Sequence, residues 1–321
     1  MFKKRLVCQQ CKKDISSDYL QALGGYWHPE CFTCTACNKP FKNNQFVLHN
    51  KKPYHKNCYQ QQYSPRCNVC DKAMEGKYIK DLWGHQYCAD HKKKLPTCSS
   101  CHRLISPKIT GGGHKLKDGR VICSMCQPTA ISANDQIDRC MSQVQKFLTQ
   151  FKLSLTCEQY KIELVSQKHL KKLTKHWSVN KGHTKTSAEG LTQTNVITQG
   201  KKEVSREVKK VLILYGLPRE HFTSVLAHEM FHVWLFVNRF PKLPLKVEEG
   251  LCTLIEFLYL SSQRTDTANM RMKQIQLNKD KIYGTGFRTA YKFYRSSSLG
   301  TLLNYVKNNG KFPNVLSTQF W

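Results

Sequence analysis

The most constraining feature of this 321-residue sequence is a regular series of cysteine and histidine pairs near its N-terminus. In each pair, two intervening residues let one tight turn direct both side chains at a single ion. Four such pairs follow one another up to residue 58, and they divide into two tetrahedral sets of ligands. The sets are Cys8, Cys11, His28 and Cys31, and then Cys34, Cys37, His55 and Cys58. The spacing therefore predicts two closed zinc sites that lie back to back.

These eight ligands, with the stretch Trp27–Phe32 around the first histidine, resemble the LIM domain. We expect a LIM zinc-binding domain over residues 1–62. A closed tetrahedral site has no open coordination position, so both zinc ions are expected to be structural. A module of this size has a small core and depends on its metal to fold. Its expected role is to present a surface to protein partners.

A second run of cysteines and histidines repeats this plan less regularly and predicts a LIM-like zinc-binding domain over residues 63–128. A strict repeat would use His85 as a ligand, but the next cysteine pair arrives only at Cys98, so His91 is preferred and His85 is the alternative. The predicted third site is Cys67, Cys70, Cys88 and His91, and the fourth is Cys98, Cys101, Cys123 and Cys126. The assignment uses every cysteine before residue 127.

The use of cysteine also indicates a cellular compartment. Repeated Cys-x-x-Cys pairs with interleaved histidines are typical of metal sites, and their thiolates persist best in a reducing environment. The N-terminal residues contain no apolar stretch that would serve as a signal peptide. We expect a soluble, cytoplasmic protein without a membrane span. The remaining cysteines, Cys140, Cys157 and Cys252, lie among apolar residues and are expected to be buried free thiols.

The formal net charge is +29, and it stays strongly basic after bound thiolates and zinc ions are counted. Such a charge favours acidic partners without naming them. A nucleic-acid-binding protein is one alternative, but no zinc-binding pair is joined to a clearly basic recognition helix. The expected partners are therefore proteins, with nucleic acid as the weaker hypothesis.

The sequence changes character after residue 128, and residues 129–321 predict an α+β domain. Apolar residues at helical spacing between Ile137 and Phe151 predict a packed helix. Strand-like patterns occupy residues 160–165, 190–199 and 210–215, the last with four consecutive apolar residues. Gly216 and Pro218 then interrupt the chain, and Arg219 begins a long helical segment.

That segment contains His228-Glu229-Met230-Phe231-His232. Histidines four residues apart share one face of a helix, so both rings reach one zinc ion. The flanking residues are apolar around most of the helix, so these polar side chains are expected inside a core. Burial of histidines and a glutamate costs free energy unless they are paired or bind a metal. The motif predicts a zinc peptidase in which Glu229 is the general base for a zinc-activated water.

A third zinc ligand is expected on the next helical stretch, where Glu248 and Glu249 precede a glycine. Glu249 is the preferred ligand because many zinc peptidases with a glutamate ligand carry a similar Glu-Gly signature, and Glu248 is the alternative. An oxyanion donor is also expected, with Tyr283 as the first candidate and His183 as the second. The strand around Val211–Tyr215, just before the motif helix, is expected to be the edge strand along which an extended substrate pairs.

The combination of a LIM domain, a LIM-like unit, the His-Glu-Met-Phe-His motif and Glu-Glu-Gly resembles the ubiquitin-activated LIM-domain peptidases of plants, the DAR family. The likeness also includes the stretches Ile213–Arg219 and Tyr283–Arg288. The resemblance implies a zincin-type, gluzincin-like fold, endopeptidase activity, zinc bound by His228, His232 and Glu249, and Glu229 as the base. Family members carry ubiquitin-interacting motifs ahead of the LIM domain, and only seven residues precede Cys8 here. Ubiquitin or ubiquitinated proteins therefore enter as partners by resemblance alone.

The resulting hypothesis is a zinc endopeptidase with one catalytic and four structural zinc ions. Its LIM modules would recruit substrates or partners, or regulate the active site. The alternative is a LIM-type interaction adaptor whose peptidase domain is inactive.

Overall fold

The computed structural model describes residues 5–41, 45–155, 161–181, 189–200 and 202–314, with backbone alone for 175–181. The chain divides into two compact units, Met1–Leu95 and Pro96–Trp321. Among the described residues, no helix is both long and apolar enough to cross a membrane.

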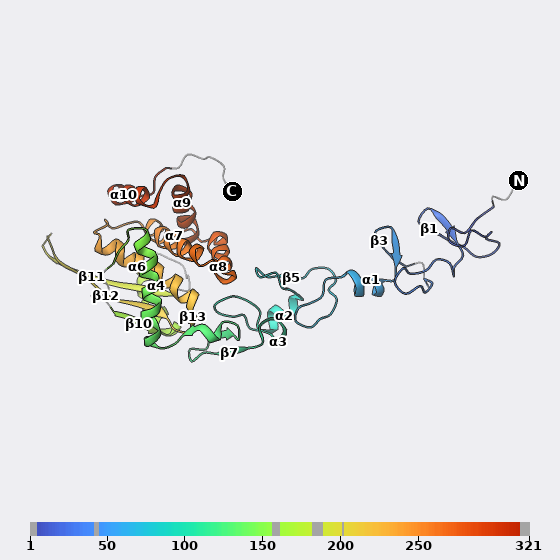
Figure 1. The fold of residues 1–321 in the computed structure, drawn as a ribbon, viewed down its shortest axis with the longest axis horizontal. Coiled ribbons are helices and arrows are strands. Elements are labelled where there is room, and N and C mark those ends of the chain that lie inside the picture. The colour runs from blue at the N-terminus through green and yellow to red at the C-terminus, as the bar shows by residue number, and fades with distance from the viewer. Residues whose placement is uncertain (1–4, 42–44, 156–160, 182–188, 201, 315–321) are drawn as a thin grey trace. The chain divides into compact units, whose positions relative to one another are not determined.

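Short hairpins and the helices α1 and α2 make up the described part of the first unit (Figure 1). Its elements are β1 (Leu20–Ala22), β2 (Gly25–Trp27), β3 (Val47–His49), β4 (Lys52–Tyr54), α1 (Lys56–Tyr63), β5 (Ile79–Lys80), β6 (Gln86–Tyr87) and α2 (Ala89–Lys94). The pairs β1–β2, β3–β4 and β5–β6 are antiparallel. A small core of Phe32, Cys34, Phe41 and Tyr54 lies between the first two cysteine-rich segments.

The second unit begins with another small hairpin and continues into the α+β domain. Its first elements are α3 (Pro107–Thr110), β7 (Gly113–Lys115), β8 (Val121–Cys123), the 3-10 turns η1 (Gln127–Thr129) and η2 (Asn134–Gln136), β9 (Ala130–Ile131), α4 (Ile137–Gln150), β10 (Lys161–Val165) and α5 (Gln167–Lys181). They are followed by β11 (Gly190–Gln199), β12 (Lys202–Leu214), β13 (Leu217–Pro218), α6 (Arg219–Val237), α7 (Leu245–Gln263), α8 (Asp266–Leu277), α9 (Tyr283–Ser296) and α10 (Leu299–Asn309). The expected helix and strands are confirmed by α4, β10, β11 and β12.

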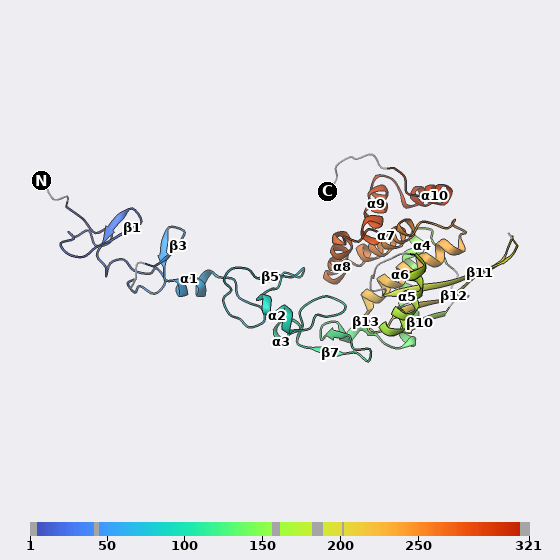
Figure 2. The same cartoon turned by 180° about the vertical axis from the view of Figure 1, so that it is seen from behind.

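The described sheet of this domain has the order β10-β12-β11, with β10 parallel and β11 antiparallel to β12. The segment that was expected to be an edge strand is thus the central strand, and that prediction was wrong. Residues 211–214 are at most 3% exposed, because a continuous apolar run suits a strand covered on both faces. Figures 1 and 2, drawn from opposite sides, show α4 and α5 on opposite faces of the sheet. An outer edge of the described sheet is formed by β11.

Helix α6 forms the centre of the domain. It contacts β11 and β12 on one side and α7 on the other, and α4 also packs against it. Twelve of its 19 residues are buried, which fits its apolar sequence. Pro218 precedes its first turn, a position where the missing N–H of proline costs nothing. The helical layer α7 to α10 then completes the core.

The fourth cysteine segment lies in the same compact unit as the α+β domain, so the predicted domain boundary at residue 128 falls inside this unit. Its β7–β8 turn contacts the end of β12. Arg120 is stacked 5.2 Å from the Tyr215 ring and donates to the Tyr215 carbonyl, while the Asp118 N–H donates to the Tyr215 hydroxyl at 2.8 Å. Asp118 also accepts the Gln167 N–H, and its ion pair with Arg120 measures 3.0 Å. These groups tie the cysteine-rich segment to the sheet.

Asp118 gives a pH-dependent test of this contact. Burial raises the pKa of its carboxyl, but the Gln167 N–H and the Arg120 guanidinium together hold the pKa below its ordinary value. A lowered folded pKa contributes stability above the unfolded pKa of about 3.9, and that stability is lost as the pH falls through the folded pKa. We expect Asp118→Asn to lower the free energy of unfolding at pH 7 by about 3 kcal/mol, because Arg120 loses its buried partner.

Denaturant unfolding followed by tryptophan fluorescence would measure this difference between pH 7 and acid. The difference in free energy of unfolding between wild type and Asp118→Asn should become smaller below about pH 4. Asp138→Asn, at an exposed carboxylate on α4, is the matched control and should change little. A gap that is the same at every pH would contradict the assignment.

Candidate metal centres

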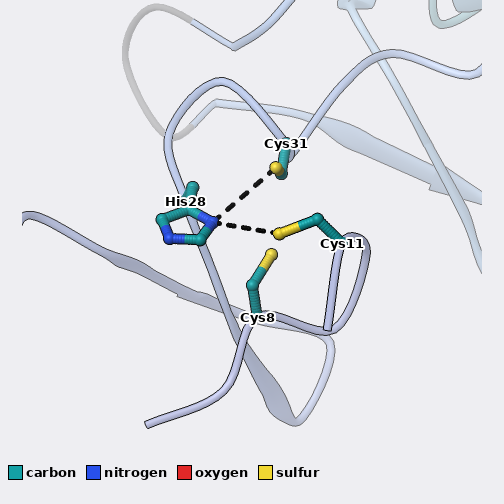
Figure 3. Close-up of side chains that lie close together, drawn as sticks. All are labelled: Cys8, Cys11, His28 and Cys31. Carbon is teal, nitrogen blue, oxygen red and sulfur yellow. Dashed lines mark hydrogen bonds between the residues drawn. The ribbon is translucent and has the colours of Figure 1, made fainter. Parts of the chain in front are cut away.

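In the first cluster, four side chains converge on one point (Figure 3). The Nδ1 atom of His28 lies 3.4 Å from the Cys11 sulfur and 3.8 Å from the Cys31 sulfur. Its Nε2 atom lies 3.2 Å from the Asp14 carbonyl oxygen, which can only accept a hydrogen bond. This contact keeps the proton on Nε2 and leaves the Nδ1 lone pair free for a metal ion.

The second cluster repeats the arrangement. His55 Nδ1 lies 3.3 Å from the Cys37 sulfur, and His55 Nε2 lies 3.3 Å from the Pro40 carbonyl oxygen. The sulfur of the fully buried Cys34 accepts the His55 backbone N–H at 3.3 Å. Backbone carbonyls therefore orient both histidines in the same way, as expected for ligands of a structural zinc.

The third cluster brings together Cys67, Cys70, Cys88 and His91, with ligand atoms within 4.8 Å of one another. His91 Nε2 is buried without a hydrogen-bond partner in the described part of the chain, which fits a role as a metal ligand. The alternative ligand, His85, instead bonds through Nδ1 to the Asp81 carboxylate at 3.0 Å. The geometry therefore favours His91.

Four buried cysteines, Cys98, Cys101, Cys123 and Cys126, form the fourth cluster. The sulfurs of Cys101 and Cys123 lie 3.7 Å apart, and the Cys123 N–H donates to the Cys98 sulfur at 3.3 Å. Four thiolates at this spacing are a ligand set typical of structural zinc.

The first cysteine of each of the first three clusters favours its thiolate form. Burial raises the pKa of Cys8, Cys34 and Cys67, but donation from neighbouring backbone N–H groups outweighs burial and lowers the pKa to about 6. A thiolate is the form of cysteine that binds a metal. The turn geometry of each pair therefore prepares its sulfur for zinc.

A fifth group of ligand-type side chains lies between α6 and α7. His228 and His232 lie one helical turn apart, with ring centroids separated by 5.2 Å. Their Nε2 atoms lie 3.2 and 3.7 Å from the same oxygen, Oε2 of Glu249. Both nitrogens thus lie close to one carboxylate oxygen, and all three residues are largely buried.

Other carboxylates hold the opposite sides of these rings. His228 Nδ1 lies 3.5 Å from Glu256 and His232 Nδ1 lies 3.0 Å from Glu248. A carboxylate at Nδ1 favours a proton there, which would leave the Nε2 lone pair available for a metal ion between the ring and Glu249. Sequence reasoning considered Glu248 and Glu249 alone and missed Glu256, although its position seven residues after Glu249 places it on the same helical face.

Glu229 lies beside the pair and is held against β11. Thr192 donates its hydroxyl to Glu229 Oε2 at 2.8 Å, and Gly190 lies so close that an added Cβ would be 2.4 Å from Glu229 Oε1. The carboxylate is 5% exposed, and burial is the main cause of its raised pKa. A glycine and a threonine on β11 therefore set the position of this carboxylate.

Close packing of two helices explains why glycine, Gly250, follows Glu249. A Cβ on Gly250 would lie 2.5 Å from the Gly286 backbone, so α7 and α9 cross at these two glycines. Glu249 lies next to this crossing, on the part of the chain where α7 packs against α6. Tyr283, a candidate oxyanion donor, is half-buried at the first position of α9, and its role stays a prediction. The other candidate, His183, lies outside the described residues.

Cys252 is the residue whose surroundings differ most from expectation. It is fully buried, as expected, but its sulfur lies within 4.8 Å of ligand atoms of both His228 and His232. Its position three residues after Glu249 puts it on the same face of α7, a periodicity that would have indicated the proximity. Cys140 is buried on α4 and Cys157 lies outside the described residues.

The fold and these clusters define a protein that joins LIM-type zinc modules to an α+β domain with a buried His-Glu-x-x-His helix. Residues 8–63 match the family model of the LIM domain, and residues 155–272 match the DA1-like family model, described as Protein DA1. The chain is therefore a LIM-domain protein with a DA1-like domain, and the resemblance seen in the sequence is confirmed. Its LIM clusters are zinc-binding.

Similarity to individual relatives extends over nearly the whole chain. The chain is 28% identical to Protein DA1-related 1 of Arabidopsis thaliana over 96% of its own length and 66% of that protein. It is 28% identical to the LIM domain-containing protein HDR3 of Oryza sativa subsp. japonica, with 96% and 74% covered, and 26% identical to Protein DA1 of Arabidopsis thaliana, with 96% and 68% covered. The chain thus spans about two thirds of the length of these relatives.

The N-terminal clusters predict a strong dependence of the first unit on metal. We expect Cys34→Ser to abolish hydrogen-exchange protection in β3, β4 and α1, because a structural zinc supplies about 10–16 kcal/mol in comparable small modules. Hydrogen exchange with mass spectrometry measures this segment by segment. Cys140→Ser alters a buried cysteine outside the clusters and should leave residues 45–63 protected. Unchanged protection in Cys34→Ser would refute a structural metal at this site.

Proposed function

We propose that this chain is a zinc-dependent endopeptidase whose fifth metal site is formed by His228, His232 and Glu249. The observation that carries the proposal is the convergence of both Nε2 atoms on Glu249 Oε2, at 3.2 and 3.7 Å. Three protein ligands of this type leave one coordination position open, as in catalytic rather than structural zinc sites. A zinc ion at these ligands would lower the pKa of a water molecule and polarise the carbonyl of a peptide bond.

Glu229 is the proposed general base. Its position next to His228 puts the carboxylate beside the ligand set, and Thr192 holds one oxygen while the other faces Gly190. Burial raises the pKa of Glu229, which makes the carboxylate a better proton acceptor near neutral pH than an exposed one. Glu229 would accept a proton from the attacking water and deliver it to the leaving amine.

The outer strand β11 is the proposed docking site for an extended substrate. Gly190 and Thr192, which touch Glu229, are at its start, so a peptide paired with its outer edge in the described sheet would pass beside the proposed base. This replaces the central strand β12 in that role. The LIM modules would recruit protein substrates or partners.

The second candidate function is that of an interaction adaptor without peptidase activity. It is favoured by the confirmed LIM domain, since such modules present surfaces to other proteins. The two functions differ in the expected number of metal ions. Native mass spectrometry should find five zinc ions in the wild-type chain and four in His228→Ala. Four in both proteins would favour the adaptor.

A change at the proposed base separates chemistry from metal binding. We expect Glu229→Gln to keep five zinc ions but to reduce cleavage of a proteome-derived peptide library about 10²–10⁴-fold, the usual contribution of general acid–base catalysis. The cleavage products would be quantified by mass spectrometry. Undiminished cleavage by this variant would disprove the proposed mechanism.

A second variant tests how Glu229 is positioned. In Gly190→Ala, the added Cβ would collide with the Glu229 carboxylate, and a misplaced catalytic group costs about 10²-fold in rate. We expect Gly190→Ala to cleave about 10²-fold more slowly and to retain all five zinc ions. Gly300→Ala on α10 is the matched control, because its Cβ meets its nearest neighbour at 3.9 Å. Equal activity of both variants would show that Gly190 does not position the base.

A further inference from the structure

A buried hydrogen bond joins the fourth cysteine cluster to the helix that carries the histidine motif. Ser100, inside the Cys98–Cys101 turn, places its hydroxyl oxygen 2.7 Å from His221 Nδ1 on α6. Ser100 is 4% exposed and His221 is 1% exposed. The two residues are 121 positions apart in the chain, so this contact is a product of tertiary packing.

The contact continues through a chain of polar groups to His228. His221 Nε2 lies 2.7 Å from Glu189 Oε2, and Arg271 bridges Glu189 at 3.6 Å and Glu256 at 3.4 Å. Glu256 in turn lies 3.5 Å from His228 Nδ1. The side chains of Arg271 and Glu256 are each 12% exposed, and that of Glu189 is 30% exposed. The path thus begins in the cysteine turn and ends at the candidate ligand.

The direction of each hydrogen bond follows from the charges. Burial raises the pKa of Glu189, but its neighbours His221 and Arg271 lower it to about 2, so the carboxylate can only accept. Burial lowers the pKa of His221, which favours a neutral ring with one donor and one acceptor. Nε2 must then donate to Glu189, and Nδ1 accepts the hydroxyl proton of Ser100. Ser100 therefore completes the hydrogen bonding of a buried imidazole.

Arg271 links this arrangement to the metal centre. Its positive charge lies between two carboxylates, and Ser224 donates a further hydrogen bond to Glu256 Oε1 at 3.2 Å. An ionised Glu256 accepts the proton on His228 Nδ1 and so would leave the Nε2 lone pair available for a metal ion beside Glu249. Loss of a partner on this path would leave a neighbouring buried group unsatisfied and free to reorient.

The β7–β8 turn holds the cysteine segment in register for this contact. Arg120 and Asp118 form hydrogen bonds to Tyr215 at the end of β12, next to α6. Their side chains are 6% and 4% exposed. At Gly216, an added Cβ would meet Leu116 at 2.8 Å, so the two backbones also approach closely there. Two separate contacts, at the turn and at Ser100, therefore join the fourth cluster to the helix of the candidate site.

We propose that the fourth cysteine cluster acts as a positioning element of the His228 metal centre, through Ser100, His221, Glu189, Arg271 and Glu256. This inference rests on the proposed function in one respect, the assignment of His228 as a metal ligand. In this role Ser100, His221, Glu189, Arg271 and Glu256 act on the His228 ring and not on the reacting atoms. They fix the orientation of the His228 ring, whose Nε2 atom would bind the ion.

The test uses the full chain with Ser100→Ala and its neighbour Ser99→Ala as the matched control. Ser99 is half-buried in the same turn, and its backbone N–H bond to the Val121 carbonyl survives the change. Native mass spectrometry during a chelator titration would count the zinc ions. We expect Ser100→Ala to keep its four cysteine-cluster ions and to lose the fifth at about tenfold lower chelator concentration, the lower end of the cost of losing an outer partner of a ligand.

Glu189→Gln provides a second variant that leaves the cysteine turn untouched. It removes the charge next to Arg271 while keeping the shape of the side chain, so it should weaken the fifth site in the same selective way. This variant keeps the test decisive if Ser100→Ala does not fold. Wild-type retention of the fifth ion by each folded variant would overturn the proposal.

Hydrogen exchange of the His221–His232 segment separates this inference from the proposed peptidase function, because it needs no fifth metal. If the wild-type chain binds four zinc ions, the assignment of His228 as a ligand fails. Faster exchange of this segment in Ser100→Ala than in Ser99→Ala would still support positioning of α6 by the fourth cluster. Equal exchange in the two variants would overturn it.

Discussion

The C-terminal domain depends on the burial of α6 between the sheet and α7. Residues such as Phe222, Leu226 and Phe231 are fully excluded from solvent, and the stacked Phe231 and Trp234 rings extend the contact. Burial of each large apolar side chain contributes about 1.5–3 kcal/mol relative to exposure. The same packing carries two histidines and a glutamate into the core, where polar groups are tolerated only with partners. The carboxylates of α7 and the hydroxyl of Thr192 on β11 are those partners.

The two units obtain their stability in different ways. The first has a core of a few aromatic residues between its cysteine clusters, so the metal ions replace a hydrophobic interior. The second has a continuous core from α4 through α10. The fourth cluster combines both, because its sulfurs form a candidate metal site while Ser100, Asp118 and Arg120 bind it to the larger core. A cysteine-rich segment of this kind is part of the domain against which it packs.

Much of the local structure could be predicted because it depends on short-range patterns. The cysteine and histidine spacing identified the groupings of the four clusters. The apolar periodicity identified α4, and the break at Gly216 and Pro218 identified the start of α6 at Arg219. The order of strands could not be predicted in this way. The apolar run at 211–214 indicated a strand but was assigned to an edge, and β11, a more polar segment, lies there instead. Pairing between strands depends on which surfaces the helices cover.

The sequence by itself determined the ligand pairs of the four cysteine-rich clusters apart from the choice between His85 and His91, because ligand chemistry and the spacing of ligands within one turn are local properties. It also placed His228, Glu229 and His232 on a buried helix. Tertiary structure alone decided that Gly190 and Thr192 hold Glu229, that Cys252 and Glu256 join the histidines, and that Ser100 reaches His221. These contacts join distant segments, and their formation depends on the packing of whole helices and strands against one another.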